Sequence, residues 1–160
     1  MSLTQPLASD HQLARLLQIG IVLEEVIEAR AAKHAAATTV DDDAELRALL
    51  EEASAESADH RRRLEALVED LDADTVPFEE IQTLVEAQYE ADEDFDGVLY
   101  DQLCNEETAY KFYDDLIDAV EASETDFGID REQLLDVLAT IRAEEAEGVE
   151  DVTELMEARQ

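Results

Sequence analysis

The chain has 160 residues and carries 44 Asp and Glu against 11 Lys and Arg, a formal charge of −33 at pH 7. This excess excludes unaided nucleic-acid binding, which needs basic groups against the phosphates, and it excludes binding to an anionic membrane surface. Leu, Ile, Val and Phe still make up 42 of the 160 residues, and Gly and Pro together only 6, so we expect a folded and mostly helical chain.

Apolar residues recur at alternating three- and four-residue steps in four long segments, which predict helices over about 10–37, 43–72, 94–122 and 130–157. A shorter segment, 77–91, opens at Pro77 and predicts an extra helix between the second and third long ones. No segment predicts a strand. We therefore expect an all-α fold with a single domain over 1–160, an up-down four-helix bundle whose long crossover carries the extra helix.

Acidic residues occur in every segment of the chain, whereas lysine occurs only at 33 and 111. Repulsion at this density destabilises a compact chain at low salt, and molar salt screens it because the Debye length falls to about 3 Å. Such a surface resembles that of proteins from salt-in halophiles, especially haloarchaea. The alternative is an acidic face for a basic partner.

Cys104 is the single cysteine, which excludes an internal disulfide and a four-thiolate metal site within one chain. The apolar run Leu16–Leu23 is too short to span a bilayer, and Met1–Asp10 contains no Lys or Arg. No Gly-rich phosphate loop is present, so we expect no nucleotide. We also expect no haem. We expect a cytoplasmic protein that binds no membrane.

The apolar face of each long segment is interrupted near its middle. The interruptions are Glu24, His60, Glu106 and Glu145, and the helix midpoints fall near residues 24, 58, 108 and 144. Because the midpoints of equal-length helices share one level of a bundle, we expect these side chains to converge. No Lys or Arg falls on the four faces, and buried carboxylates repel one another, so the group needs shared protons or a bound cation. Carboxylate and imidazole ligands suit iron, manganese or zinc. Taken singly, each residue can instead be an edge side chain that reaches solvent.

This spacing resembles that of ferritin-like and rubrerythrin-like bundles, which place one Glu on each of two helices and a Glu-x-x-His pair on each of the other two. Glu24 and Glu106 resemble the single glutamates. The segment from Glu106 through Ala109 to Tyr113 is similar to the family's Glu-x-x-Ala-x-x-x-Tyr arrangement. His60 resembles the histidine of the second helix, and Glu145 resembles the glutamate of the last.

Two positions depart from the family pattern: Ser57 stands where the family has Glu, and Gly148 where it has His. A mononuclear site, or a carboxylate-rich site completed by other acids and water, fits this chain better than a standard dinuclear centre. The neighbouring residues that would complete it are Glu28, Glu56 and Glu144 as ligands, with Tyr113 hydrogen-bonded to a ligand carboxylate. A bundle that has lost its metal is the alternative.

Two other features are expected to be structural. His34 lies about two and a half turns beyond Glu24 and is interpreted as a helix-end histidine. The run Arg61-Arg62-Arg63 points in different directions around its helix, and we expect pairing with nearby acids such as Glu65.

The resemblance implies iron handling, or oxygen or peroxide chemistry, with iron favoured over manganese or zinc. Rubrerythrins also carry a cysteine-bound iron module that this chain lacks, so redox work would need a separate electron donor. The rival hypothesis is a non-catalytic acidic helical protein, structural or partner-binding, with a degenerate metal site. Gly20 and Ala31 permit close helix approach in a structural dimer and in a partner-binding module alike. We expect a homo-oligomer, with a dimer favoured.

Overall fold

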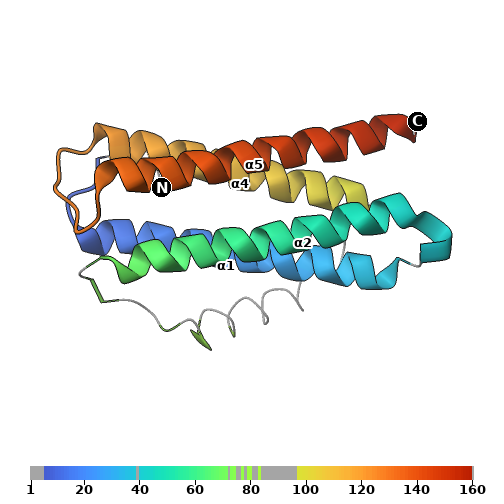
Figure 1. Ribbon diagram of the computed structural model, residues 1–160, viewed down its shortest axis with the longest axis horizontal. Helices are drawn as coiled ribbons and strands as arrows, with labels where there is room; N and C mark the ends of the chain where they lie inside the picture. Colours follow the sequence, from blue (N-terminus) through green and yellow to red (C-terminus); the bar gives the residue numbers. More distant parts are fainter. Residues whose placement is uncertain are drawn as a thin grey trace.

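The computed structural model describes residues 6–38, 40–71, 73–74, 77, 79–80, 83 and 97–159, without the side chains of 40–42. This part of the chain forms four long helices and no strand: α1 (Asp10–Ala37), α2 (Val40–Glu69), α4 (Val98–Ala122) and α5 (Arg131–Ala158) (Figure 1). The all-α prediction is confirmed, with helix bounds close to those expected. The predicted crossover helix at 77–91 lies largely outside the described residues.

Polar side chains explain where α1 begins and where α2 becomes regular. The Ser9 hydroxyl accepts a hydrogen bond from the Gln12 amide at 3.2 Å and caps α1. Asp43 interrupts α2 with an extended backbone (φ −162°, ψ 82°), and its carboxylate accepts from the Leu46 amide at 3.1 Å. The regular part of α2 therefore begins after Asp43, where the sequence predicts the second helix.

Contacts between distant segments determine the directions of the helices. The Leu7 amide, just before α1, donates to the Ser123 hydroxyl, just after α4, at 2.6 Å. At the opposite end of the bundle, Arg30 in α1 donates to Asp101 in the first turn of α4 at 3.2 Å. Arg159, just after α5, donates to Asp43 near the start of α2 at 2.7 Å. Each helix therefore runs antiparallel to both of its neighbours.

The end of α2 and the start of α4 lie at opposite ends of the bundle (Figure 1). This is the arrangement that a long crossover between the second and third bundle helices requires. Among the described helices, none combines the length and the apolarity needed to span a membrane.

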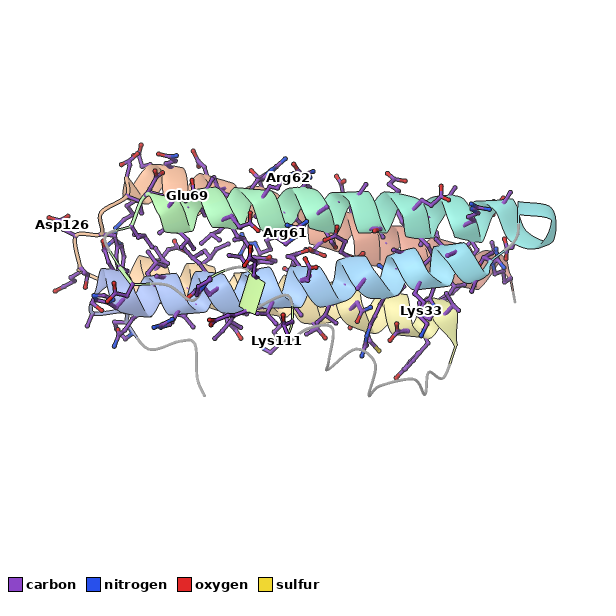
Figure 2. The ribbon with its side chains drawn as sticks, turned by 90° about the horizontal axis from the view of Figure 1, so that it is seen from below. Lys33, Arg61, Arg62, Glu69, Lys111 and Asp126 are labelled. Atoms are coloured by element: carbon purple, nitrogen blue, oxygen red, sulfur yellow. The ribbon has the colours of Figure 1, made fainter. Side chains whose placement is uncertain are left out.

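The apolar core occupies mainly the half of the bundle that contains the start of α1. Its larger members lie on all four helices: Leu13, Leu17, Ile21, Ile27, Leu64, Leu67, Tyr113, Leu116, Val120, Leu134, Leu138 and Ile141. Arg62 and Lys111 lie on the outside of the bundle (Figure 2).

A β-carbon at Gly20 would lie 3.1 Å from both Leu64 and Phe112, so the close helix approach at Gly20 occurs within one chain.

We expect Arg131 to hold the connection between α4 and α5 in place. Its guanidinium donates to the carbonyls of Val120 at 2.9 Å, Ser123 at 2.6 Å and Thr125 at 3.2 Å. Arg131→Ala should lower the free energy of unfolding by about 2 kcal/mol, because it removes charged hydrogen bonds from the end of α4. Urea unfolding measures this, with Arg62→Ala as the exposed matched control. Equal stability of the two variants would contradict the assignment.

Candidate metal centre

Three buried ligand-type side chains from three helices meet near the middle of the bundle. They are Glu24 of α1, His60 of α2 and Glu145 of α5, and none is more than 1% exposed. One ligand atom from each lies within 4.8 Å of the other two, so this group could hold a metal ion. These are three of the four residues that the helix midpoints bring to one level.

The Nδ1 atom of the His60 ring faces the two buried glutamates. It lies 3.0 Å from Glu145 Oε1, with which it shares a hydrogen bond, and 3.5 Å from Glu24 Oε1. The Tyr113 hydroxyl of α4 donates to Glu24 Oε1 at 2.7 Å, as the sequence led us to expect. The second oxygen of Glu24 is buried and has no hydrogen-bond partner.

The opposite side of the same ring faces two further glutamates. His60 Nε2 lies 3.5 Å from Glu144 Oε2 and 3.9 Å from Glu56 Oε1. Both glutamates are partly exposed, whereas Nε2 itself is buried and makes no hydrogen bond. The ring therefore separates an inner pair of carboxylates from an outer pair.

Glu106 reaches the centre from α4, although its carboxylate is not within the group of three. It is buried, and its Oε1 accepts a hydrogen bond from the Gln102 amide at 2.7 Å. A β-carbon at residue 148 would lie only 2.6 Å from Glu106 Oε2. Gly148, noted in the sequence for the missing histidine, thus provides the space that the Glu106 carboxylate occupies. Ser57, the other departure, is buried.

Glu28 and His34 lie apart from the centre. The Glu28 carboxylate accepts from Arg61 at 3.2 Å, which draws it to the side of the bundle. Arg61 also lies 3.3 Å from Glu65, the pairing expected from the sequence. His34 lies 3.2 Å from Asp101 and joins the end of α1 to the start of α4, which is a structural role.

Two carboxyl groups and one hydroxyl group at the centre have raised pKa values. Burial raises the pKa of Glu145 strongly, and its hydrogen bond with Glu106 and the charge of Glu24 act in the same direction. Burial also raises the pKa of Glu56 to about 7, against the opposing effect of His60. Burial and the nearby Glu24 carboxylate raise the pKa of the Tyr113 hydroxyl well above its ordinary value.

The pKa of His60 is also raised, although burial alone would lower it. Burial lowers the pKa of its imidazole, but a hydrogen bond to Glu24 and the charges of Glu24, Glu56 and Glu144 outweigh it, so the net shift is upward. Glu145, although the nearest carboxyl group, is held protonated by its own raised pKa and adds little charge. In the metal-free protein, protons therefore compensate the buried acids.

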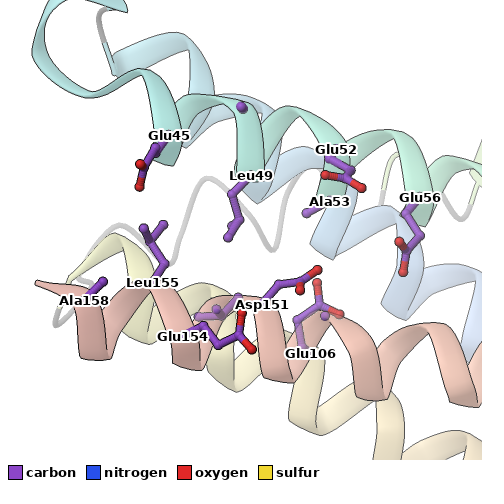
Figure 3. Close-up of a pocket in the computed structure, with 13 residues that line it drawn as sticks. Glu45, Leu49, Glu52, Ala53, Glu56, Glu106, Asp151, Glu154, Leu155 and Ala158 are labelled. Carbon is purple, nitrogen blue, oxygen red and sulfur yellow. The ribbon is translucent and has the colours of Figure 1, made fainter.

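An open groove lies beside this centre, between the first half of α2 and the second half of α5 (Figure 3). Its volume is about 550 Å3. Its lining combines apolar side chains with carboxylates: Glu45, Leu49, Glu52, Glu56, Glu106, Asp151, Val152, Glu154 and Leu155, with four small residues. Glu56 and Glu106 line the groove and also lie near the centre, whereas Glu24, His60 and Glu145 are buried and do not line it.

The donor atoms fit a divalent transition metal. The centre offers carboxylate oxygens and one imidazole nitrogen, the set that iron, manganese and zinc accept. At metal–ligand bonds of about 2.1 Å, two ligands at a tetrahedral angle lie about 3.4 Å apart. The 3.0 and 3.5 Å separations at Nδ1 are close to that value. Within the described residues, His60 is the basic side chain that contacts Glu24 and Glu145.

Comparison of the chain with protein-family models, with curated proteins and with solved structures gave no match. The ferritin-like resemblance therefore stays a prediction, based only on the residues of this chain and their spacing.

The raised pKa values predict that the metal-free protein loses stability as pH rises. Glu56, Glu145 and His60 all bind protons more tightly in the folded chain than in the unfolded chain, so the free energy of unfolding falls with rising pH. For Glu56 the window runs from its ordinary 4.5 to about 7, and for His60 it begins at 6.5 and extends upward.

Urea unfolding from pH 5 to 8, with EDTA and constant KCl, measures this slope. Ordinary surface carboxylates are already ionised at pH 6, so a loss of stability above that pH belongs to the buried groups. Glu56→Gln should flatten the slope between pH 5 and 7. Stability that rises with pH in this range would contradict the shifts.

We expect Gly148→Ala to weaken metal binding by about tenfold, because the new β-carbon displaces the Glu106 carboxylate beside Glu145. Helix propensity alone would favour alanine by about 1 kcal/mol, so a loss of affinity without a loss of helix separates the two effects. Titration with Mn2+ measures the affinity. In a Glu106→Ala background the same substitution should have little further effect, and a full tenfold loss there would refute the mechanism.

Proposed function

We propose that this chain is a ferritin-like metal-binding protein that holds a divalent transition metal among its four helices. Iron is favoured over manganese or zinc, and the function is iron handling or chemistry of oxygen or peroxide. The observation that carries the proposal is the approach of Glu24, His60 and Glu145 within 4.8 Å of one another at buried positions on three helices.

Each residue of the centre has a distinct role in this proposal. Glu24, His60 and Glu145 would ligate the metal, and Glu106 would approach it from the fourth helix. The Tyr113 hydroxyl holds Glu24 by a 2.7 Å hydrogen bond, which orients one carboxylate oxygen and leaves the other available. Binding of a cation would release the protons that Glu145 and His60 hold in the metal-free protein.

Iron or manganese, when bound, would supply redox chemistry toward oxygen or peroxide. The contribution of the chain is to exclude bulk water from the inner face of His60, where the apolar half of the bundle begins, and to admit small molecules through the groove. Cys104 is exposed and is the only cysteine, so electrons would come from a separate donor protein. We further propose that the acidic surface suits the protein to high salt.

Metal analysis tests the proposal directly. Purified protein is loaded anaerobically with Fe2+, or with Mn2+ or Zn2+, in about 1 M KCl, which screens diffuse binding to the surface acids. After removal of free ions, wild-type protein should retain at least one ion per chain. Retention of none by a well-folded protein would reject the proposal and favour the non-catalytic acidic alternative.

The variant Glu145→Gln should change metal binding and metal-free stability in opposite directions. It removes a proposed ligand, so the ion held between Glu24, His60 and Glu145 should be lost. It also removes a buried acid with a raised pKa, so the metal-free protein at pH 8 should be more stable by about 1–2 kcal/mol. Glu147→Gln, at an exposed position of the same helix, is the matched control. A Glu145→Gln protein that keeps the full metal content of wild type would remove Glu145 from the ligand set.

A further inference from the structure

The outer face of His60 carries a second set of ligand atoms that the proposed inner site does not use. His60 Nε2 faces Glu144 Oε2 at 3.5 Å and Glu56 Oε1 at 3.9 Å. The inner site uses the opposite nitrogen, Nδ1, with Glu24 and Glu145. The two nitrogens of one ring therefore point to two different pairs of carboxylates.

Two of the atoms on the outer face, His60 Nε2 and Glu144 Oε2, are buried and have no hydrogen-bond partner. Nε2 belongs to a side chain with 1% exposure and makes no hydrogen bond. Glu144 Oε2 is likewise buried and has no hydrogen-bond partner. A buried donor or acceptor without a hydrogen-bond partner costs free energy. These two atoms face each other as an ion pair at 3.5 Å, which is also close to the spacing of two ligands on one metal ion.

The charge around this position favours a cation. Glu56 and Glu144 are both acidic, and Glu106 and Glu24 are close enough to affect the ionisation of Glu56. Arg63 lies 3.7 Å from the other oxygen of Glu144 and 2.9 Å from Asp59, so it leaves Glu144 Oε2 directed at His60. Glu56 also lines the groove, so an ion from solvent reaches this face first.

We propose that a second divalent cation binds on the outer face of His60, held by His60 Nε2, Glu144 and Glu56 with water. The ring then bridges the two cations, one at each nitrogen. A neutral imidazole carries one N–H, so binding at both nitrogens releases that remaining proton to solvent. This inference rests on the proposed inner site, because the two positions share His60.

Stoichiometry with Co2+ tests the second position. In about 1 M KCl, wild-type protein should bind two ions per chain. The double variant Glu56→Gln/Glu144→Gln should bind one, with the inner affinity changed less than about threefold, and Glu24→Gln/Glu145→Gln should also bind one, at the outer position. Glu147→Gln should still bind two. Circular dichroism confirms that each variant is folded.

Electron paramagnetic resonance with Cu2+ provides a second readout. Two Cu2+ ions bridged by one ring couple their spins, so the signal of the fully loaded wild type should integrate to fewer than two spins. The Glu56→Gln/Glu144→Gln protein, with one ion, should give the full signal of an isolated Cu2+.

Three results would overturn the second position. Saturation of wild type at one ion would mean that the outer face binds none. Loss of all metal in Glu56→Gln/Glu144→Gln would mean that the inner and outer pairs of carboxylates bind a single ion together. Two uncoupled Cu2+ ions would place the second ion away from the ring. Binding of no ion by wild type would reject the inner site as well, which distinguishes failure of the proposed function from failure of this inference alone.

Discussion

The structure depends on how buried negative charge is compensated at the middle of the bundle. Glu24 and Glu145 are almost fully inaccessible, and the described basic side chain that reaches them is His60. A buried carboxylate is costly unless it is paired, protonated or bound to a metal. The raised pKa values of Glu145 and His60 show that protons fill this role without a metal. A cation bound by these atoms would replace the protons.

The two halves of the bundle differ in their packing around this centre. The apolar cluster in one half supplies the burial that stabilises the chain and keeps water from the inner face of His60. In the other half, the groove between α2 and α5 brings solvent to Glu56 and Glu106. The centre therefore lies between an apolar half of the bundle and a half with a groove open to solvent.

Much of this arrangement can be predicted from the sequence, because helix periodicity and helix length depend on local pattern. The midpoints placed Glu24, His60 and Glu145 at one level, and the structure brings these three together. The details that need tertiary contacts could not be predicted. Glu28 is drawn away by Arg61, from another helix, and Gly148 matters because the Glu106 carboxylate occupies the space beside it. Neither contact has a signal in the spacing of residues along one helix.

The Asp43–Arg159 pair at the far end of α2 and α5 has a kinetic consequence. This end holds fewer large buried apolar side chains, and a partly exposed ion pair contributes little to stability. Local opening of this end costs less free energy than global unfolding, so its amide protons exchange with solvent sooner than those packed around Leu13 and Leu134. The centre lies at the border of this less protected region. If an ion binds at the proposed centre, parting of these helix ends would let it exchange while the rest of the bundle stays folded.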